Sequence, residues 1–74
     1  MNEIKFKENP TIENDFSYHA PKEGQSEVYA AIRGKIKEVV YYINEVAPDS
    51  REKSLSFTKL EEAVMWANAA IARN

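Results

Sequence analysis

The sequence predicts an all-α protein: an antiparallel two-helix hairpin over about residues 22–46 and 50–73, preceded by an N-terminal arm over residues 1–16. Two observations predict this fold. Two long segments repeat apolar residues at the spacing of a helix face, without the alternation of a β-strand. Only a short connection around Pro48 separates them, so the helices must run antiparallel and pack their apolar faces together. We therefore divide the chain into an arm, residues 1–16, and a helical-hairpin domain, residues 17–74.

The arm mixes charged residues with Asn, Pro and Thr and shows no sustained apolar period. This pattern predicts an extended or flexible segment that has no role in a core. Further along, Pro21 suits the first turn of a helix, and Gly24 weakens that helix soon after its start. We accordingly expect the first long helix to begin near Lys22.

The first long helix is predicted from a single apolar stripe whose members recur at intervals of three or four residues. They are Val28, Ile32, Ile36, Val39, Ile43 and Val46. Gly34 falls on the opposite side, where glycine costs roughly 1 kcal/mol relative to alanine. A close approach by another helix or a ligand would explain it, and so would simple tolerance.

The second long helix has a recognisable start. Pro48 prevents a helix from running through from upstream, Asp49 can cap the first turn, and Glu52 can reach back to the N–H of the cap. The residues of this helix that should face its partner are Phe57, Leu60, Val64, Ala67 and Ile71.

The other side of the second helix is unusual for a solvated face. Arg51, Thr58, Glu62 and Met65 line up along it, and Leu55, Trp66 and Ala69 lie beside them. Because leucine, methionine and tryptophan seldom line a purely solvated face, we expect this side to meet another copy of the chain or a ligand.

Length and composition exclude several classes of protein. A chain of 74 residues forms one domain whose own core supplies only a few kcal/mol, so self-association is expected. The absence of cysteine excludes disulfides and thiolate metal sites and favours an intracellular protein. There is no long apolar run and no signal peptide, so we expect a soluble protein with no membrane partner. A net charge of −2 argues against a DNA or RNA polymer as partner.

The sequence gives little support for catalysis. His19 is the only histidine and has no further ligands at metal-binding spacing. Glu61 and Glu62 are adjacent, so they point about 100° apart on a helix and cannot converge on one proton. No hydroxyl nucleophile has a recognisable base beside it. We predict no enzyme, no metal site and no cofactor.

Two groups of residues are candidates for binding an anionic ligand. Arg51 lies in the first turn of the second helix, where unpaired N–H groups and the helix dipole favour an anion, and Ser54 and Thr58 follow on the same face. The alternative is that Arg51 pairs with Glu52 or Glu62 on a wet surface.

The second group combines an aromatic side chain with two cations. Tyr18 at the entrance of the hairpin can stack on a nucleobase, while Arg33 and Lys37 flank the apolar stripe and can hold a phosphate. Equally, Tyr18 can serve only to fasten the chain onto the start of the helix.

Three pieces of the sequence form a recognisable set of motifs. They are Tyr18-His-Ala-Pro-Lys-Glu-Gly-Gln25, Tyr29-Ala-Ala-Ile-Arg33, and Arg51-Glu-Lys-Ser-Leu-Ser-Phe-Thr-Lys-Leu60 followed by Met65-Trp-Ala67. In these motifs, residues 17–74 resemble the helical-hairpin family of phage sponge proteins, which includes the second anti-CBASS protein and the first Thoeris anti-defence protein.

The resemblance implies a homo-oligomer, often a hexamer, that works in the cytoplasm of the host cell. Such proteins bind cyclic dinucleotides, cyclic trinucleotides or cyclic ADP-ribose isomers tightly and do not cleave them, so that the host's immune effector receives no signal. The ligands lie in two kinds of pocket between subunits.

Matched by position, the stacking tyrosine and the basic residue of the family's dinucleotide-type pocket fall on Tyr18 and Arg33. The arginine and threonine of its trinucleotide-type pocket fall on Arg51 and Thr58. The candidate sites are therefore Tyr18, Arg33 and Lys37 for the first pocket, and Arg51, Ser54 and Thr58 for the second.

Two alternatives remain open. One is a small helical module that binds another protein through Leu55, Met65 and Trp66 and has no small ligand. The other is a hydrolase of cyclic messengers, which would release a linear product.

Overall fold

A computed structural model describes residues 7–74 and contains three helices in this range, with no β-strand. They are α1 (Pro10–Asp15), α2 (Gln25–Val46) and α3 (Arg51–Arg73). The predicted all-α class is confirmed. The first six residues of the predicted arm lie outside the described range.

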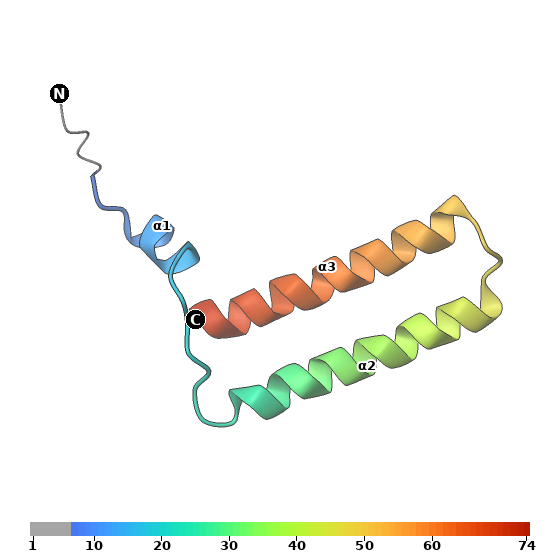
Figure 1. The fold of residues 1–74 in the computed structure, drawn as a ribbon, viewed down its shortest axis with the longest axis horizontal. Coiled ribbons are helices and arrows are strands. Elements are labelled where there is room, and N and C mark those ends of the chain that lie inside the picture. The colour runs from blue at the N-terminus through green and yellow to red at the C-terminus, as the bar shows by residue number, and fades with distance from the viewer. Residues whose placement is uncertain (1–6) are drawn as a thin grey trace.

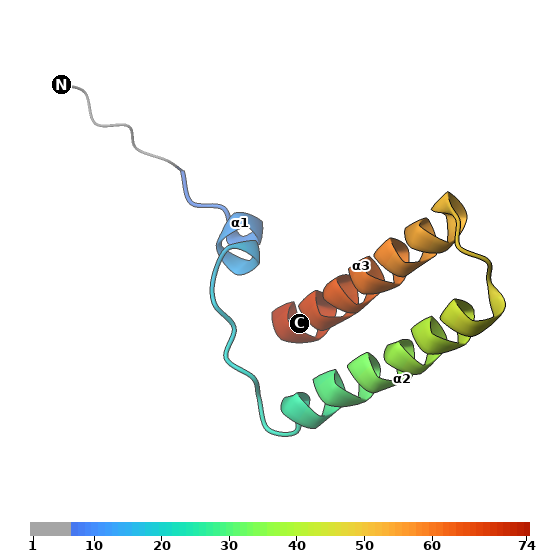
Figure 2. The same ribbon diagram turned by 45° about the vertical axis from the view of Figure 1, so that its right-hand side comes forward.

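Helices α2 and α3 form the body of the molecule (Figure 1). They lie side by side along their length, and the chain reverses direction between them at residues 47–50, as the turned view in Figure 2 also shows. Helix α1 lies apart from this pair, next to the C-terminal end of α3. The end of α1, at Asn14 and Asp15, therefore lies beside Arg73 at the end of α3.

The face of α3 that packs on α2 is the predicted one. Its half-buried apolar residues include Phe57, Leu60, Val64, Ala67 and Ile71. Their spacing keeps them on one side of the helix, so each turn of α3 contributes to the same seam.

The predicted stripe of α2 is wrong at half of its positions. Val28, Val39 and Val46 are exposed, at 45%, 44% and 60% of their surface, whereas Tyr29 and Val40 are half-buried beside the three isoleucines. The reason is that α2 is apolar over a wide arc, so several adjacent stripes fit the same spacing. The valines left outside form part of an exposed apolar surface.

The starts of both long helices also differ from the prediction. Gly24 is the N-cap of α2 rather than an interior residue, and its φ of 81° is a left-handed conformation that glycine adopts without strain. At α3 the cap is Ser50 and not Asp49, because Ser50 Oγ accepts the N–H of Lys53 at 3.1 Å. Asp49 instead pairs with the ammonium group of Lys53 at 2.9 Å.

Helix α1 corrects the prediction of an extended arm. Asn9 caps this helix by accepting the N–H groups of Thr11 and Ile12, and Pro10 occupies the first helical turn. A helix of six residues is too short to display an apolar period, which is why periodicity did not reveal it.

The chain alone has no interior. None of the described residues is fully buried, and the molecule measures only 16 Å along its shortest axis. Its radius of gyration is 18.0 Å, compared with about 11 Å for a compact domain of this length. Its accessible surface is 6727 Å², compared with roughly 4,700 Å² for a typical folded monomer of this mass. Within residues 7–74, a lone chain thus leaves eleven large apolar or aromatic side chains exposed.

Within residues 7–74, no helix has both the length and the apolar composition needed to cross a lipid bilayer.

Candidate functional site

Tyr18 lies in the connection between α1 and α2 and is 88% exposed. The ring therefore does not fasten the chain onto α2, and that alternative is wrong for the isolated chain. Tyr18 lines a cavity of about 370 Å³ together with His19, Tyr29, Asn68 and Arg73. This volume is at the small end of the range for small-molecule pockets.

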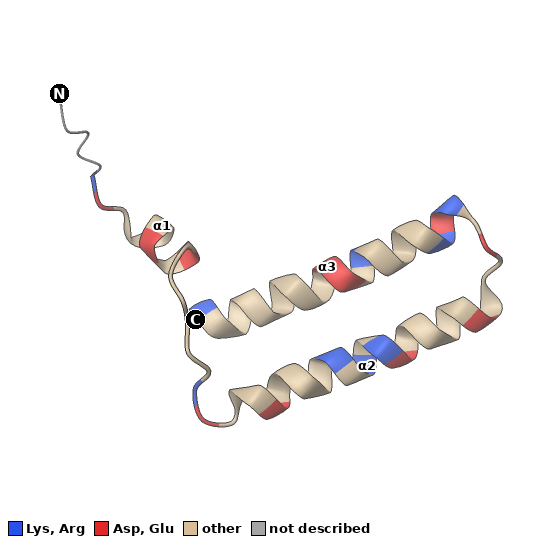
Figure 3. Cartoon of the chain, viewed as in Figure 1, with Lys and Arg blue, Asp and Glu red and all other residues tan. Residues whose placement is uncertain are grey.

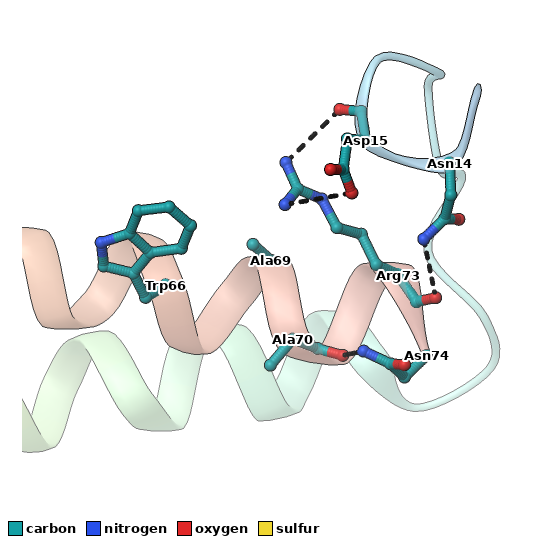
Figure 4. A pocket seen from close by; sticks show the side chains of 7 residues that line it. All are labelled: Asn14, Asp15, Trp66, Ala69, Ala70, Arg73 and Asn74. Carbon is teal, nitrogen blue, oxygen red and sulfur yellow. Dashed lines mark hydrogen bonds and ion pairs between the residues drawn. The ribbon is translucent and has the colours of Figure 1, made fainter. Parts of the chain in front are cut away.

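Arg73 and helix α1 are tied together at the end of α3 (Figure 4). The guanidinium of Arg73 lies 3.6 Å from the carboxylate of Asp15 and donates to the Asp15 carbonyl at 3.4 Å. Asn14 donates from its side chain to the Arg73 carbonyl at 3.4 Å, and His19 donates from Nε2 to the Asn14 carbonyl at 2.6 Å. We call Asn14, Asp15 and Arg73 the α1 clasp.

Two residues of the α1 clasp line two cavities. Asp15 and Arg73 line the cavity that contains Tyr18, and they also line a second one of about 330 Å³ that contains Trp66. In Figure 4 the Arg73 side chain extends from the last turn of α3 toward Asp15 at the end of α1, and Trp66 lies further back along α3. Arg73 thus lines one cavity with Tyr18 and the other with Trp66.

Asn68 adds a polar group to the wall beside Tyr18. Its side-chain Oδ1 is shielded from solvent and has no hydrogen-bond partner among the described residues. An unpaired buried acceptor costs free energy, so a donor that reached it would stabilise this wall.

Arg33 and Lys37 do not meet Tyr18 within one chain. They lie in the middle of α2, where Figure 3 shows basic residues gathered, and they line a different cavity of about 450 Å³ with Glu61 of α3. Apolar residues of both helices, among them Met65, form most of the rest of that cavity. Within one chain, Tyr18 and these two cations therefore line separate cavities.

Arg51, Ser54 and Thr58 share one exposed face of α3, as predicted. Neither alternative partner of Arg51, Glu52 or Glu62, forms an ion pair with it; within residues 7–74, Glu62 pairs with Lys59 at 3.7 Å. The Thr58 hydroxyl donates to the Ser54 carbonyl at 3.2 Å, so it must rotate before it can donate to a ligand. Its oxygen can accept a hydrogen bond without moving.

Thr58 lines a cavity of about 400 Å³ beside Glu61, Glu62, Met65 and Trp66. Within residues 7–74, Arg51 and Ser54 lie outside this cavity and the three described above. The three residues therefore lie on an exposed face and do not line one shared pocket. A neighbouring subunit would have to supply the other wall.

The site residues can stack on a nucleobase and hold an anion. Among residues 7–74, no group of three or more His, Cys, Asp or Glu side chains lies in a position to hold a metal ion. Sequence reasoning missed Asp15, Asn68 and Arg73 as neighbours of Tyr18. The only available signal was that Arg73 ends an amphipathic helix, and it does not indicate what Arg73 meets.

A comparison with protein-family models matches residues 8–72 to the model described as Acb2/Tad1, hairpin domain. No curated protein matches the chain, and no solved structure matches it. The family match includes α1, α2 and all of α3 except its last residue, Arg73.

Proposed function

The chain belongs to the Acb2/Tad1 hairpin family, a family of anti-CBASS and anti-Thoeris proteins, and from this membership we propose that it sequesters cyclic nucleotide messengers of antiviral signalling. The proposed ligands are cyclic dinucleotides, cyclic trinucleotides or cyclic ADP-ribose isomers. The protein holds them intact in the cytoplasm of the host cell, so that the immune effector is not activated.

The observation that carries the proposal beyond the family match is the exposure of Tyr18. A tyrosine that is 88% exposed and lines a cavity buries little of its surface against its own chain. It is free to stack on a nucleobase, an interaction worth about 1–3 kcal/mol per base. Arg33 and Lys37 of a neighbouring subunit then hold the phosphates of the same ligand.

Self-association is part of the proposal, because single chains offer only parts of pockets. The chain exposes roughly 2,000 Å² more than a compact monomer of its mass. A stable interface removes about 800 Å² from each partner, so this excess is sufficient for two neighbours per chain. A closed ring or a hexamer meets that requirement.

The second proposed pocket joins Arg51, Ser54 and Thr58 of several chains around a cyclic trinucleotide. Repetition by symmetry would present one arginine to each phosphate, and arginine matches phosphate oxygens with two parallel donors. The N-terminus of α3 adds favourable dipole charge beside Arg51.

We propose binding without chemistry, because within residues 7–74 the available groups already have backbone partners. His19 beside Tyr18 donates from Nε2 to the Asn14 carbonyl, and the Ser17 and Thr58 hydroxyls donate to backbone carbonyls rather than to a general base. Calorimetric titration with cyclic di- and trinucleotides and cyclic ADP-ribose tests binding. Recovery of the ligand after denaturing the protein tests cleavage: sequestration returns the cyclic compound, whereas a hydrolase returns a linear one.

The second candidate function is a protein-interaction module without a small ligand. It is favoured by the exposure of Met65 and Trp66, at 65% and 63%, beside Leu55 at 46%. This alternative predicts no heat with any nucleotide and a complex with a protein other than itself.

A further inference from the structure

The cation that lines the same cavity as Tyr18 is not one of the predicted site residues. Arg73 lines the same cavity as Tyr18, whereas Arg33 and Lys37 line a separate one. Because Arg73 comes from the last turn of α3 and Tyr18 from the segment after α1, the clasp brings together residues from opposite ends of the sequence.

We propose that Arg73 binds a phosphate of the ligand that stacks on Tyr18 of the same chain. Without ligand, Asp15 is paired with Arg73, and the ligand phosphate displaces Asp15 on binding. This inference rests on the proposed function, because it assumes that a nucleotide stacks on Tyr18. Cations from a neighbouring subunit then complete the site around the rest of the ligand.

The existing contacts of Arg73 are weak enough to be exchanged. The ion pair with Asp15 is long, at 3.6 Å, and the two side chains are 33% and 38% exposed. Ion pairs exposed to this degree contribute little stability. The hydrogen bond to the Asp15 carbonyl is also long, at 3.4 Å. A phosphate offers shorter, charge-assisted bonds to both arms of the same guanidinium.

The volume of the cavity beside Tyr18 suits one part of a cyclic nucleotide. A space of about 370 Å³ is at the lower end of small-molecule pockets, so it suits one nucleoside phosphate better than a whole cyclic dinucleotide. Tyr18 and Tyr29 offer aromatic surface for the base, and Asn68 offers an amide in the same wall. Arg73 is then placed for the phosphate.

The effect of Asp15 on affinity distinguishes a ligand-binding role of Arg73 from a purely structural one. Its carboxylate competes with phosphate for Arg73 and repels an approaching anion. If Arg73 serves only to hold α1 on α3, removing either partner of the ion pair damages the same arrangement. If Arg73 binds phosphate, removing Asp15 and removing Arg73 must change affinity in opposite directions.

The experiment titrates the intact oligomer with cyclic di-AMP, cyclic di-GMP and 3′,3′-cyclic GMP-AMP, and repeats the titration with three variants. Arg73→Gln should weaken binding by roughly tenfold or more. Asp15→Asn should tighten it by about three- to tenfold, because the competing charge is lost while the amide can still accept a hydrogen bond. Asp49→Asn, at the far end of the hairpin, is the matched control and should leave affinity unchanged.

The outcomes separate this inference from the proposed function. Wild-type protein that binds none of the wider panel of cyclic nucleotides contradicts the proposed function itself. If the wild-type protein binds and Arg73→Gln binds with the same affinity, the proposed role of Arg73 is wrong. The same holds if Arg73→Gln and Asp15→Asn weaken binding to a similar degree. Neither result contradicts the proposed function. Circular dichroism and the mass of each variant oligomer verify that the variants keep the helical assembly.

Discussion

Replacing Trp66 with alanine should weaken self-association strongly. Trp66 is 63% exposed in the single chain, so most of its contact area is still available to a partner. A tryptophan side chain buries about 150–250 Å², which leaves roughly 95–160 Å² for the interface. At about 25 cal/mol per Å², its loss removes about 2–4 kcal/mol per subunit contact, or roughly 30- to 700-fold in the dissociation constant.

The assay can use Trp66 itself as the probe, because it is the only tryptophan in the chain. On dilution of the wild-type protein, the emission of Trp66 should shift to longer wavelength as the neighbouring subunit dissociates and exposes the indole to water. The shift should coincide with a fall in mass measured by sedimentation. Sedimentation of Trp66→Ala then gives the change in the dissociation constant.

Lys59→Ala is the matched control, because Lys59 lies on the same helix and is exposed. It loses only its surface ion pair with Glu62, worth less than about 1 kcal/mol, so its dissociation constant should change less than about fivefold. Two results would refute the placement of Trp66 at a subunit interface. One is an unchanged dissociation constant for Trp66→Ala. The other is a wild-type emission wavelength that stays constant on dilution while the mass falls.

The remaining predictions concern the two pockets and the helix ends. Tyr18→Ala should weaken cyclic dinucleotide binding by about 1–3 kcal/mol in calorimetry and leave cyclic trinucleotide binding intact; Arg51→Ala should do the reverse, by about 2–4 kcal/mol. If both variants abolish binding of one ligand class, the two-pocket assignment is wrong. Ser50→Ala should lower the free energy of unfolding by about 1 kcal/mol because it removes the N-cap of α3, whereas Asp49→Ala should change it by less than about 0.5 kcal/mol in the same denaturant titration; equal losses would contradict the cap assignment. Gly34→Ala should raise the melting temperature, corresponding to about 0.5–1 kcal/mol, because a Cβ there meets nothing within 4 Å in the chain; a lower melting temperature would instead indicate a close contact from a neighbouring subunit.

The helical class and the inner face of α3 were predictable because they depend on local patterns. Phe57, Leu60 and Val64 repeat at helical spacing, and few other large apolar residues of α3 compete with them for the seam. In α2 the pairs Val28–Tyr29 and Val39–Val40 offer two adjacent choices. Packing against α3 selects Tyr29 and Val40, and no single-helix pattern contains that information.

The candidate site was predictable only in part. Tyr18 and Arg51 are identified by residue type, position and motif. The clasp was not predictable because Asp15 and Arg73 are 58 residues apart and meet only after α1 folds onto the end of α3. Helix α1 is held by its Asn9 cap and by long-range contacts rather than by an apolar period.

Native mass spectrometry of the purified protein, with and without the cyclic nucleotide panel, tests the central claim most directly. We predict an oligomer that gains the mass of intact cyclic messenger. A spectrum that contains only single chains, and no added mass with any cyclic nucleotide, would contradict the account.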